Sequence, residues 1–567
     1  MSYIGQKVKN NEKTMEGIDL FKKSLAMMLV LMMVIGSLAG CSSPAEEPAP
    51  ATEETTAPAE ETTSEAPAEE AMAVEQVLYW NIGSEPKTID PGLNAASDGG
   101  DVINNMFEGL VREWNGTIEP GMAESWSVSD DQMVYTFTIR DAKWSDGQAI
   151  TAFDFEYAWN RVLDPETASE YSWIFDEANV DSFKAIDEKT FEVTLKAPTP
   201  YFLGLTAFYT FFPVRQDAIE AGADGAWAVD PAKSIVNGPF MLEDYRNGDR
   251  LVLVKNPNYW RADMVTLEKI EGLMIVDEAT ALTGYESGQI HAIDQMPNAE
   301  IPRLLAEDPT FMIMPMDGVY YYALNTTVAP MDDARVRKAL TIAIDRTAIV
   351  ETVTKGGQIP ATNMVSQASR DAMGNVFSME AGDYGIPVDG SGIEEAKALL
   401  AEAGFANGEG FPELEIMYNT SEGHKAIAEA IQEMWKQNLN IDVTLTNQEW
   451  AVFQDTRKQG NFQIARSGWI GDYSDPMTYL GMFVQGSPMN YSRWEVAEYD
   501  ALLEAAKTQA PEDRFNSLYD ALDMVMDGYA YMPIYYYTDP IMVSEKVSNW
   551  EKNTRNTWFF GFAEIVE

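Results

Sequence analysis

The stretch from residue 414 to residue 470 alternates between two kinds of hydrophobic spacing, and this alternation constrains the fold more than any other feature. Apolar residues recur at every second position in 414–418, 441–445 and 462–465, as in half-buried strands. Between them, apolar side chains recur at helical spacing in 427–439, and a second helix is expected over about 449–458. This strand–helix order favours a parallel sheet with right-handed crossovers. The sequence therefore predicts an α/β fold with ligands beyond the carboxyl ends of these strands.

Each of the three expected strands is followed by a side chain that suits ligand binding. His424 and Trp450 follow the first two strands, and Asp472 follows the third. In RSGWIGD (466–472), glycines let another backbone approach closely, while Trp469 offers a broad aromatic face and Asp472 a negative charge. An extended ligand with a positively charged end needs these parts. The alternative is a strand–turn–strand joint, in which Asp472 belongs to an Asx turn and Trp469 to the core.

Earlier segments carry shorter patterns of the same kinds. Alternating apolar residues predict strands over 134–140, 191–196 and 250–255. Thr151 and Asp154 form a plausible capping box, which predicts that a helix starts there. At 567 residues the chain is long enough for two to four domains.

The first 73 residues are expected to anchor the protein and to hold its folded part away from a membrane. Residues 22–41 read KKSLAMMLVLMMVIGSLAGC, a basic flank and an apolar run too short to span comfortably. The run ends in LAGC, which resembles the lipobox of bacterial lipoproteins, so Cys41 is the expected site of lipidation and 1–41 the signal peptide. The alternative is an uncleaved signal-anchor. Residues 42–73 are Pro-, Ala-, Glu-, Thr- and Ser-rich without a basic residue, which predicts a disordered, extended tether.

Composition and motifs argue against several classes of function. The net charge of −51 disfavours nucleic acid and anionic membrane surfaces as partners. Cys41 is the only cysteine, so an internal disulfide, a cysteine nucleophile and a Cys₄ zinc site are excluded. The two histidines, His291 and His424, are far apart in sequence and make a poor metal site. No motif of a serine hydrolase or a phosphate-binding loop is present, and we expect neither an enzyme nor a cofactor.

An ordered series of blocks from about residue 77 to residue 540 resembles the solute-binding proteins of peptide ABC transporters, most closely the oligopeptide-binding branch. The blocks include EPKTIDPGLN (85–94), FEGLV (107–111), GMAESW (121–126), VNGPF (236–240), NPNYW (256–260), LNTTVAPMDDARVRKALTIAIDR (324–346), YNTSEGHKAIAEAIQEMWKQN (418–438), NQEW (447–450) and PIYYYTD (533–539). Single blocks are weak evidence, but the ordered series covers nearly the whole mature chain.

The resemblance implies a two-lobed, periplasmic-binding-protein-like (type II) fold with discontinuous lobes, mixed sheets and an additional domain. The first lobe would combine 74–107, 217–320 and 540–567, with the extra domain at 108–216, and the second lobe would be 321–539. Because the chain would then cross between the lobes twice, the family fold suits closure about a hinge.

The resemblance also implies roles for individual residues. Asp472 matches the aspartate that pairs with the α-ammonium of a peptide, and Gly468 and Ile470 match positions that hydrogen-bond the peptide backbone as an added strand. Trp450 and Trp469 match pocket walls, and Tyr537 either lines a pocket or belongs to the core. His424 and Arg466 match residues that meet the C-terminal carboxylate, although His424 could be a plain surface residue. Two positions depart from the pattern, because Lys355 lies about one position off a family lysine and Ala95 replaces an acidic residue; nearby, Ser97 matches a backbone contact.

These expectations describe a monomeric extracytoplasmic lipoprotein, lipid-anchored at the cell membrane, that captures oligopeptides and delivers them to an ABC permease. A dipeptide, a signalling peptide or a metal chelate remains an alternative ligand. A secreted enzyme is the alternative from another class, and peptide turnover would distinguish it.

Overall fold

The predicted strand–helix alternation forms one continuous unit in the protein. The computed structural model describes residues 74–567 apart from 115–116, 223–225 and 474, so the predicted signal peptide, Cys41 and the tether lie outside the described residues. The unit consists of β14 (Leu414–Asn419), α13 (Glu422–Leu439), β15 (Val443–Gln448), α14 (Trp450–Gln459) and β16 (Ile464–Ile470). β14 lies between the other two strands and pairs with both in parallel. The predicted parallel β-α-β-α-β arrangement is therefore confirmed.

Caps and packing explain where the two helices of this unit begin and what they bury. The Ser421 hydroxyl accepts a hydrogen bond from the backbone N–H of His424, and the Glu449 carboxylate accepts one from Ala451, so each helix starts with a satisfied N-terminus. On α13, Ile431 and Trp435 are fully buried against the sheet. Each such side chain contributes roughly 1.5–3 kcal/mol of hydrophobic stabilisation.

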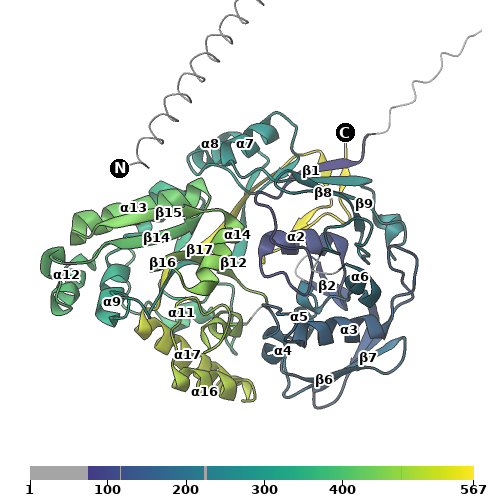
Figure 1. The fold of residues 1–567 in the computed structure, drawn as a ribbon, viewed down its shortest axis with the longest axis horizontal. Helices are drawn as coiled ribbons and strands as arrows, with labels where there is room; N and C mark the ends of the chain where they lie inside the picture. The colour runs from purple at the N-terminus through teal and green to yellow at the C-terminus, as the bar shows by residue number, and fades with distance from the viewer. Residues whose placement is uncertain (1–73, 115–116, 223–225, 474) are drawn as a thin grey trace, which may run out of the picture. The chain divides into compact units, whose positions relative to one another are not determined.

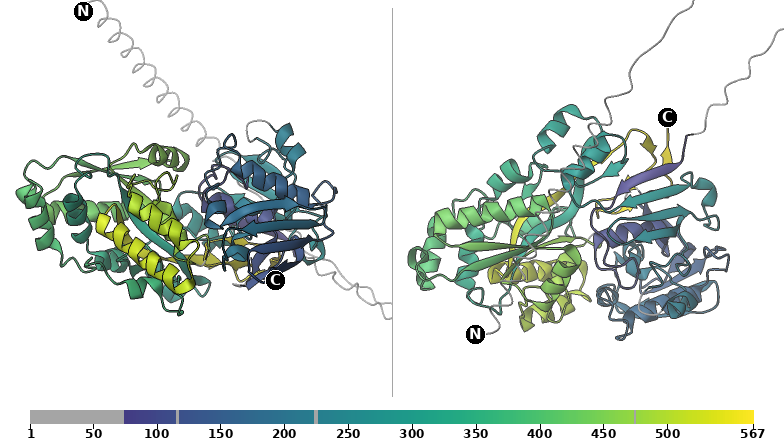
Figure 2. Two further views of the ribbon diagram at one scale, coloured as in Figure 1. Left: turned by 90° about the horizontal axis from the view of Figure 1, so that it is seen from below. Right: turned by 45° about the horizontal axis from the view of Figure 1, so that its top comes forward.

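Two long antiparallel strands join this unit to the rest of the molecule. β12 (Phe311–Leu324) and β17 (Tyr531–Val543) pair along most of their length. The sheet order is β15-β14-β16-β12-β17-β11-β1-β10-β9-β8, so the parallel unit occupies one end of the sheet. The β12–β17 register shifts between Pro315 and Val319, and this irregularity separates the two ends. Figure 1 shows two bodies: the green one holds the parallel unit with the labelled parts of β12 and β17, and the purple-to-blue one holds the first strand of the chain and the elements of residues 111–221; the two views of Figure 2 agree.

The other end of the sheet is built from strands far apart in the sequence. β1 pairs in parallel with β10 and β11, while β8, β9 and β10 form antiparallel pairs, so the sheet is mixed as expected. The elements of this part are β1 (Val77–Asn81), α2 (Ser97–Met106), β8 (Phe240–Arg246), β9 (Arg250–Lys255), η3 (Ala262–Met264), β10 (Lys269–Leu273), α7 (Glu278–Glu286), β11 (Ala292–Ile293) and α8 (Ile301–Glu307).

A separate antiparallel sheet lies within residues 111–221. It has the order β4-β5-β7-β6 and is covered by α3, whose capping box is present with Thr151 N–H 2.8 Å from the Asp154 carboxylate. The strands predicted near 134, 191 and 250 and the helix start at Thr151 are all confirmed. The elements are β2 (Val111–Trp114), β3 (Thr117–Pro120), β4 (Ala123–Val128), β5 (Val134–Ile139), α3 (Ala152–Leu163), α4 (Ile174–Glu177), β6 (Val180–Ala185), β7 (Thr190–Leu195), α5 (Phe202–Leu205), η1 (Tyr209–Phe211) and α6 (Gln216–Ala221).

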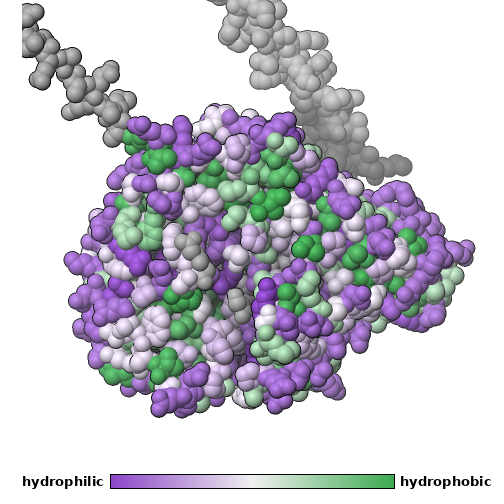
Figure 3. Space-filling model, turned by 180° about the vertical axis from the view of Figure 1, so that it is seen from behind, coloured by the Kyte–Doolittle hydropathy of each residue, from purple (hydrophilic) through white to green (hydrophobic). Residues whose placement is uncertain are grey.

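The remaining elements surround the parallel unit or form the C-terminus. They are α9 (Ala334–Ile342), α10 (Arg346–Ala348), η4 (Ile349–Thr354), β13 (Ile359–Pro360), α11 (Phe377–Ala381), α12 (Ile393–Glu402), η5 (Ala406–Gly408), α15 (Met477–Leu480), η6 (Gly481–Phe483), α16 (Ala497–Ala506), α17 (Pro511–Gly528), β18 (Val547–Ser548), β19 (Glu551–Lys552), β20 (Trp558–Phe559) and β21 (Glu564–Ile565). Within the described part of the chain, no helix combines the length and the apolar character needed to span a bilayer. The face seen in Figure 3 is mostly hydrophilic, with hydrophobic residues in scattered small groups.

Candidate functional site

The strand β16 has one paired edge and one edge that is open over most of its length. On one side it pairs with β12 from Ile464 to Ile470. On the other side β14 pairs only with Ile464 and Ala465. Among the residues that the structure describes, no strand pairs with the backbone from Arg466 to Ile470 on this side. The predicted strand therefore starts later and runs further than its apolar pattern suggested. The alternative of a turn at Trp469 is wrong because Trp469 lies inside the strand, but its expectation that Trp469 is buried in the core is confirmed.

The register identifies which backbone groups face the open edge. The N–H of Gly471 donates to the carbonyl of Asp317 at 2.8 Å, and the carbonyl of Gln463 accepts from Asn325 at 2.9 Å, so the odd-numbered residues of β16 face β12. Backbone groups alternate in direction along a strand. Gly468 and Ile470 therefore point their N–H and C=O groups toward the open edge, where a further strand could pair with them.

A cavity of about 220 Å³ lies beside this edge, between the two bodies of the molecule. It brings together eight of the nine residues that the sequence predicted for the ligand: Ser97, Trp450, Arg466, Gly468, Trp469, Ile470, Asp472 and Tyr537. His424 lines a neighbouring cavity instead, and Tyr537 borders both. The two positions that depart from the family pattern differ in location. Ala95 lines the main cavity, whereas Lys355, which follows η4 with φ 57°, lines neither the main cavity nor the neighbouring one.

Asp472 is a buried carboxylate with incomplete hydrogen bonding. Its side chain is 7% exposed, and Oδ1 lies 3.4 Å from the Tyr171 hydroxyl. Oδ2 has no hydrogen-bond partner among the described residues. Burial raises the pKa of Asp472 well above its usual value, and the charges of Glu177 and Asp317 raise it further. A carboxylate in this environment favours a cation beside it. A positive charge would offset the desolvation cost of the ionised carboxylate and its repulsion by Glu177 and Asp317.

Arg466 supplies a positive charge four residues before the last residue of β16. Its Nη2 donates to the Tyr537 hydroxyl at 2.8 Å, and its guanidinium lies 4.8 Å from the Tyr320 ring centroid. Its Nε is buried without a hydrogen-bond partner among the residues that the structure describes. The site therefore presents a carboxylate and a guanidinium near opposite ends of the same open strand edge.

His424 lies near Arg466 but is held neutral. Its Nδ1 lies 3.4 Å from the Tyr320 hydroxyl, at the N-terminal turn of α13. Burial lowers the pKa of His424 well below 6.5, and the positive charge of Arg466 lowers it further. At neutral pH this imidazole can therefore hydrogen-bond an anion but adds no charge. His291 lies elsewhere, where its Nδ1 accepts from the backbone N–H of Tyr79.

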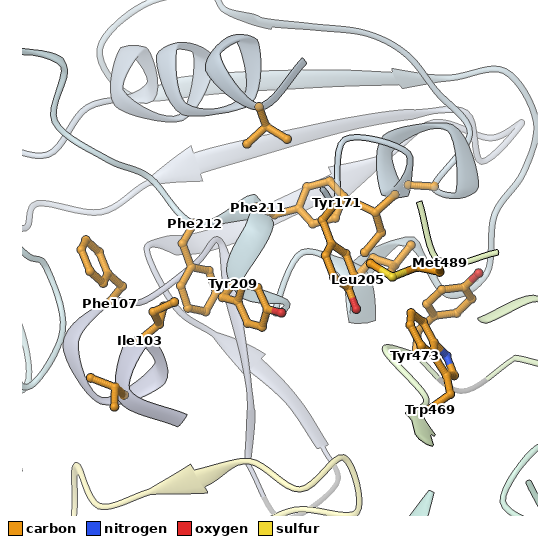
Figure 4. Close-up of a cluster of buried hydrophobic side chains, with 14 of the residues drawn as sticks. Ile103, Phe107, Tyr171, Leu205, Tyr209, Phe211, Phe212, Trp469, Tyr473 and Met489 are labelled. Carbon is orange, nitrogen blue, oxygen red and sulfur yellow. The ribbon is translucent and has the colours of Figure 1, made fainter. Parts of the chain in front are cut away.

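Aromatic side chains from both bodies form the wall beside Trp469. The rings of Tyr171 and Trp469 are nearly parallel, with centroids 6.5 Å apart. Figure 4 shows Trp469 close to Tyr171 and Met489, with Tyr209 further along the same cluster. The Trp450 indole N–H donates to the Asp98 carboxylate at 3.1 Å, which joins α14 to α2.

Sequence reasoning missed several residues of the cavity wall, some in helices and some in loops. Further residues that line the cavity include Asn104, Tyr171, Tyr209, Gln454, Arg457 and Tyr491. Gln454 and Arg457 lie one and two turns beyond Trp450 on α14, so their helical spacing could have indicated them. Tyr171 carried no such signal, because it lies 301 residues before Asp472. Within the described ranges, no group of three or more His, Cys, Asp or Glu side chains could hold a metal ion.

Comparisons with known proteins agree with this fold. The family described as bacterial extracellular solute-binding proteins, family 5 Middle, matches residues 117–491. The oligopeptide-binding protein OppA of Bacillus subtilis (strain 168) is 36% identical over 83% of this chain and 89% of that protein. The Escherichia coli murein tripeptide binding protein MppA, 33% identical, matches with a TM-score of 0.80 over 87% of this chain and 99% of that one.

A second structure of this relative gives a lower score. The structure described as the unliganded open form of MppA, also 33% identical, has a TM-score of 0.59 over 87% of this chain and 98% of that one. The structural matches confirm the expected two-lobed, periplasmic-binding-protein-like α/β fold. The chain therefore belongs to the family 5 extracellular solute-binding proteins of bacteria.

Proposed function

We propose that this protein captures oligopeptides outside the cytoplasm and delivers them to an ABC permease. The observation that carries the proposal is the open edge of β16 beside the buried, incompletely paired carboxylate of Asp472, in one cavity. A peptide offers a backbone that can extend the sheet and an α-ammonium that can pair with Asp472. The 36% sequence identity to the oligopeptide-binding protein of Bacillus subtilis supports oligopeptides as the ligand class.

Backbone pairing explains how such a site would accept many sequences. Gly468 and Ile470 would exchange hydrogen bonds with the peptide main chain, which every peptide offers regardless of its side chains. Trp469, Trp450 and Tyr537 would form walls around the side chains, and Ser97 would contact the backbone from α2. A Cβ at position 468 would lie 2.4 Å from the Tyr537 hydroxyl, so glycine is needed for this close approach.

The C-terminal carboxylate of the peptide would meet Arg466, with His424 as a hydrogen-bond donor for peptides that extend past it. Arg466 is the charged group at that end of the open edge, and the two cavities meet at its partner Tyr537. Both walls of the cavity come from one chain, so a monomer would suffice for binding.

The better match to one MppA structure than to its open form supports a closed arrangement of the lobes here. The proposal includes the division of the chain into two lobes and an extra domain. The first lobe comprises 74–107, 217–320 and 540–567, the second lobe 321–539, and the extra domain 108–216. Closure would enclose the ligand because the cavity is lined from both bodies.

Isothermal titration calorimetry with tetra-alanine, together with mass spectrometry of ligands that co-purify with the protein, tests the proposed function. We expect stoichiometric binding, recovery of intact peptide and peptides among the co-purified ligands. Turnover of the peptide would instead indicate an enzyme. If neither tetra-alanine nor a mixture of tri- to hexapeptides binds, and no peptide co-purifies, the proposal is wrong.

We further propose that Cys41 carries lipid and anchors the protein to the extracytoplasmic face of the cell membrane. The support is the sequence LAGC at residues 38–41 with the acidic tether behind it. Firm retention requires more than one acyl chain, because one chain binds membranes only marginally. Cys41→Ser should release or misprocess the protein, as fractionation and mass spectrometry of the N-terminal peptide would reveal. A mutant that stays membrane-bound, with no lipid on the wild type, would contradict the anchor.

A further inference from the structure

Helix α14 makes polar contacts with three segments of the other body. Asp455 Oδ1 lies 2.7 Å from the Nζ of Lys87, which follows β1. Lys458 forms an ion pair with Glu170, which lies between α3 and α4. Together with the hydrogen bond from Trp450 to Asp98, these contacts bring one short helix against three separate parts of the other body.

The four charged residues form three successive ion pairs of alternating sign, and the two ends of the series lie three residues apart on α14, so we refer to the set as a ring. Lys87 Nζ lies 4.0 Å from Glu170 Oε1, in addition to its contact with Asp455, so the order around the ring is Asp455, Lys87, Glu170, Lys458. Each body contributes one positive and one negative charge. The two charges on α14 therefore match the facing pair in only one orientation, since the reversed orientation would place like charges together.

The ring lies directly beside the residues that line the cavity. Tyr171 follows Glu170, Gln454 precedes Asp455, and Arg457 precedes Lys458, and all three of these neighbours line the cavity. The charged residues are partly exposed, with side-chain exposures of 23% for Lys458 and 57% for Asp455. They therefore belong to the rim of the cavity and are not among the groups that contact its contents.

We infer that the ring of Lys87, Glu170, Asp455 and Lys458 is a latch that holds α14 over the enclosed ligand and fixes the orientation in which the two bodies close. These are positioning residues, and the inference rests on the proposed function in taking the ligand to be a peptide. A ligand inside the closed cavity would leave only after the ring separates. The ring should accordingly govern the dissociation rate and its salt dependence, with little effect on the recognition of the peptide itself.

The test uses charge reversals that leave the net charge unchanged. Asp455→Lys with Lys458→Glu reverses the α14 side only, which places like charges opposite each other at both contacts. Lys87→Glu with Glu170→Lys reverses the other side, and the combination of all four substitutions restores the alternation with every sign inverted. Dissociation of tetra-alanine is followed by stopped-flow tryptophan fluorescence, at about 20 mM and about 500 mM salt, which screens exposed charges strongly.

We expect each double variant to dissociate about three- to tenfold faster than wild type at low salt, since partly exposed ion pairs contribute modestly. The fourfold variant should return to within about threefold of wild type. Wild type should dissociate faster at high salt, while the double variants should respond in the opposite sense or not at all. The inference fails if the double variants dissociate like wild type, or if the fourfold variant does not recover.

A matched control reverses an ion pair within one body. Lys436→Asp with Asp442→Lys inverts an exposed pair beside α13 and keeps the net charge, and it should leave dissociation unchanged. If it accelerates dissociation equally, the ring has no special role. Thermal unfolding of each variant checks that the fold is retained.

A second readout separates this inference from the proposed function. Spin labels at Met264→Cys and Met373→Cys, both exposed and on different bodies, report the distance between the bodies in the Cys41→Ser chain without any peptide. The closed distance should be less populated in the double variants than in wild type. If no peptide binds but this population shifts, the latch stands and the proposed ligand class is wrong; equal populations reject the latch.

Discussion

Asp472 is the residue on which affinity should depend most strongly. An α-ammonium enclosed in the cavity is removed from water, and in the proposed binding mode the buried Asp472 carboxylate pairs with it. Asp472→Ala would leave that ammonium buried and unpaired, at about 3–5 kcal/mol, or about two to four orders of magnitude in the dissociation constant. Calorimetry with tetra-alanine measures the change.

Two comparisons isolate the charge of Asp472 from its packing. N-acetyl tetra-alanine should bind wild type weakly, because the carboxylate then stays unpaired, but the acetyl group should matter little in Asp472→Ala. Trp469→Ala should reduce affinity less and unevenly among peptides, since it removes wall and leaves backbone pairing intact. Binding of unmodified peptide to Asp472→Ala within about threefold of wild type would exclude the ammonium assignment.

His424 should affect the pH dependence of stability. Its pKa is lowered in the folded protein, whereas an unfolded histidine has a pKa of about 6.5. As pH falls below about 6.5 the unfolded chain binds a proton that the folded chain does not, so stability is lost toward the lowered pKa. His424→Gln should therefore lose less thermal stability than wild type between pH 7 and pH 5, as measured by calorimetric melting. Identical losses in the two proteins would show that His424 titrates normally.

At the residue scale, spacing alone predicted the side chains that follow the strands but not those that face them from other segments. Asp472, Trp450 and His424 could be placed because strand ends share one edge of a parallel sheet. Tyr171 and Glu170 could not, because their positions depend on how the segment between α3 and α4 packs against α14, and no local periodicity records such a contact.

At the scale of the element, the open edge of β16 predicts a periodic response to changes in the peptide backbone. A peptide that extends the sheet turns alternate N–H groups toward Gly468 and Ile470. N-methylation of each residue of tetra-alanine in turn should therefore weaken binding by about one to two orders of magnitude only at positions whose N–H faces β16. The affinity of each methylated peptide is the measurement, and a uniform loss along the peptide would argue against strand addition.

Elements with strong periodicity were the most predictable. The apolar face of α13 and the alternation of β14 located the parallel unit correctly, because burial on one face requires those spacings. The end of β16 was less predictable, since Ser467 and Gly468 break the apolar alternation while the strand continues through pairing with β12. Hydrogen bonding to a distant strand thus extended an element that side-chain pattern alone would have ended.

At the scale of the whole molecule, peptide binding should close the cleft. The closed arrangement contacts a ligand from both bodies, whereas an open arrangement contacts it from one, so the ligand shifts the equilibrium by this difference. Solution scattering should show a smaller radius of gyration with saturating tetra-alanine. A sample freed of co-purified ligand by unfolding and refolding is the reference, and an unchanged radius would contradict hinge closure.

The unpartnered oxygen of Asp472 also affects how often the protein closes without a bound peptide. With no cation beside it, closing the two bodies would either bury an uncompensated negative charge or require the Asp472 carboxyl to take up a proton, because burial raises its pKa, and both costs disfavour closure in the absence of cargo. A permease that responds to the closed form would then seldom meet a closed protein without cargo. We expect this one carboxylate to limit futile cycles, in which the transporter hydrolyses ATP and imports nothing.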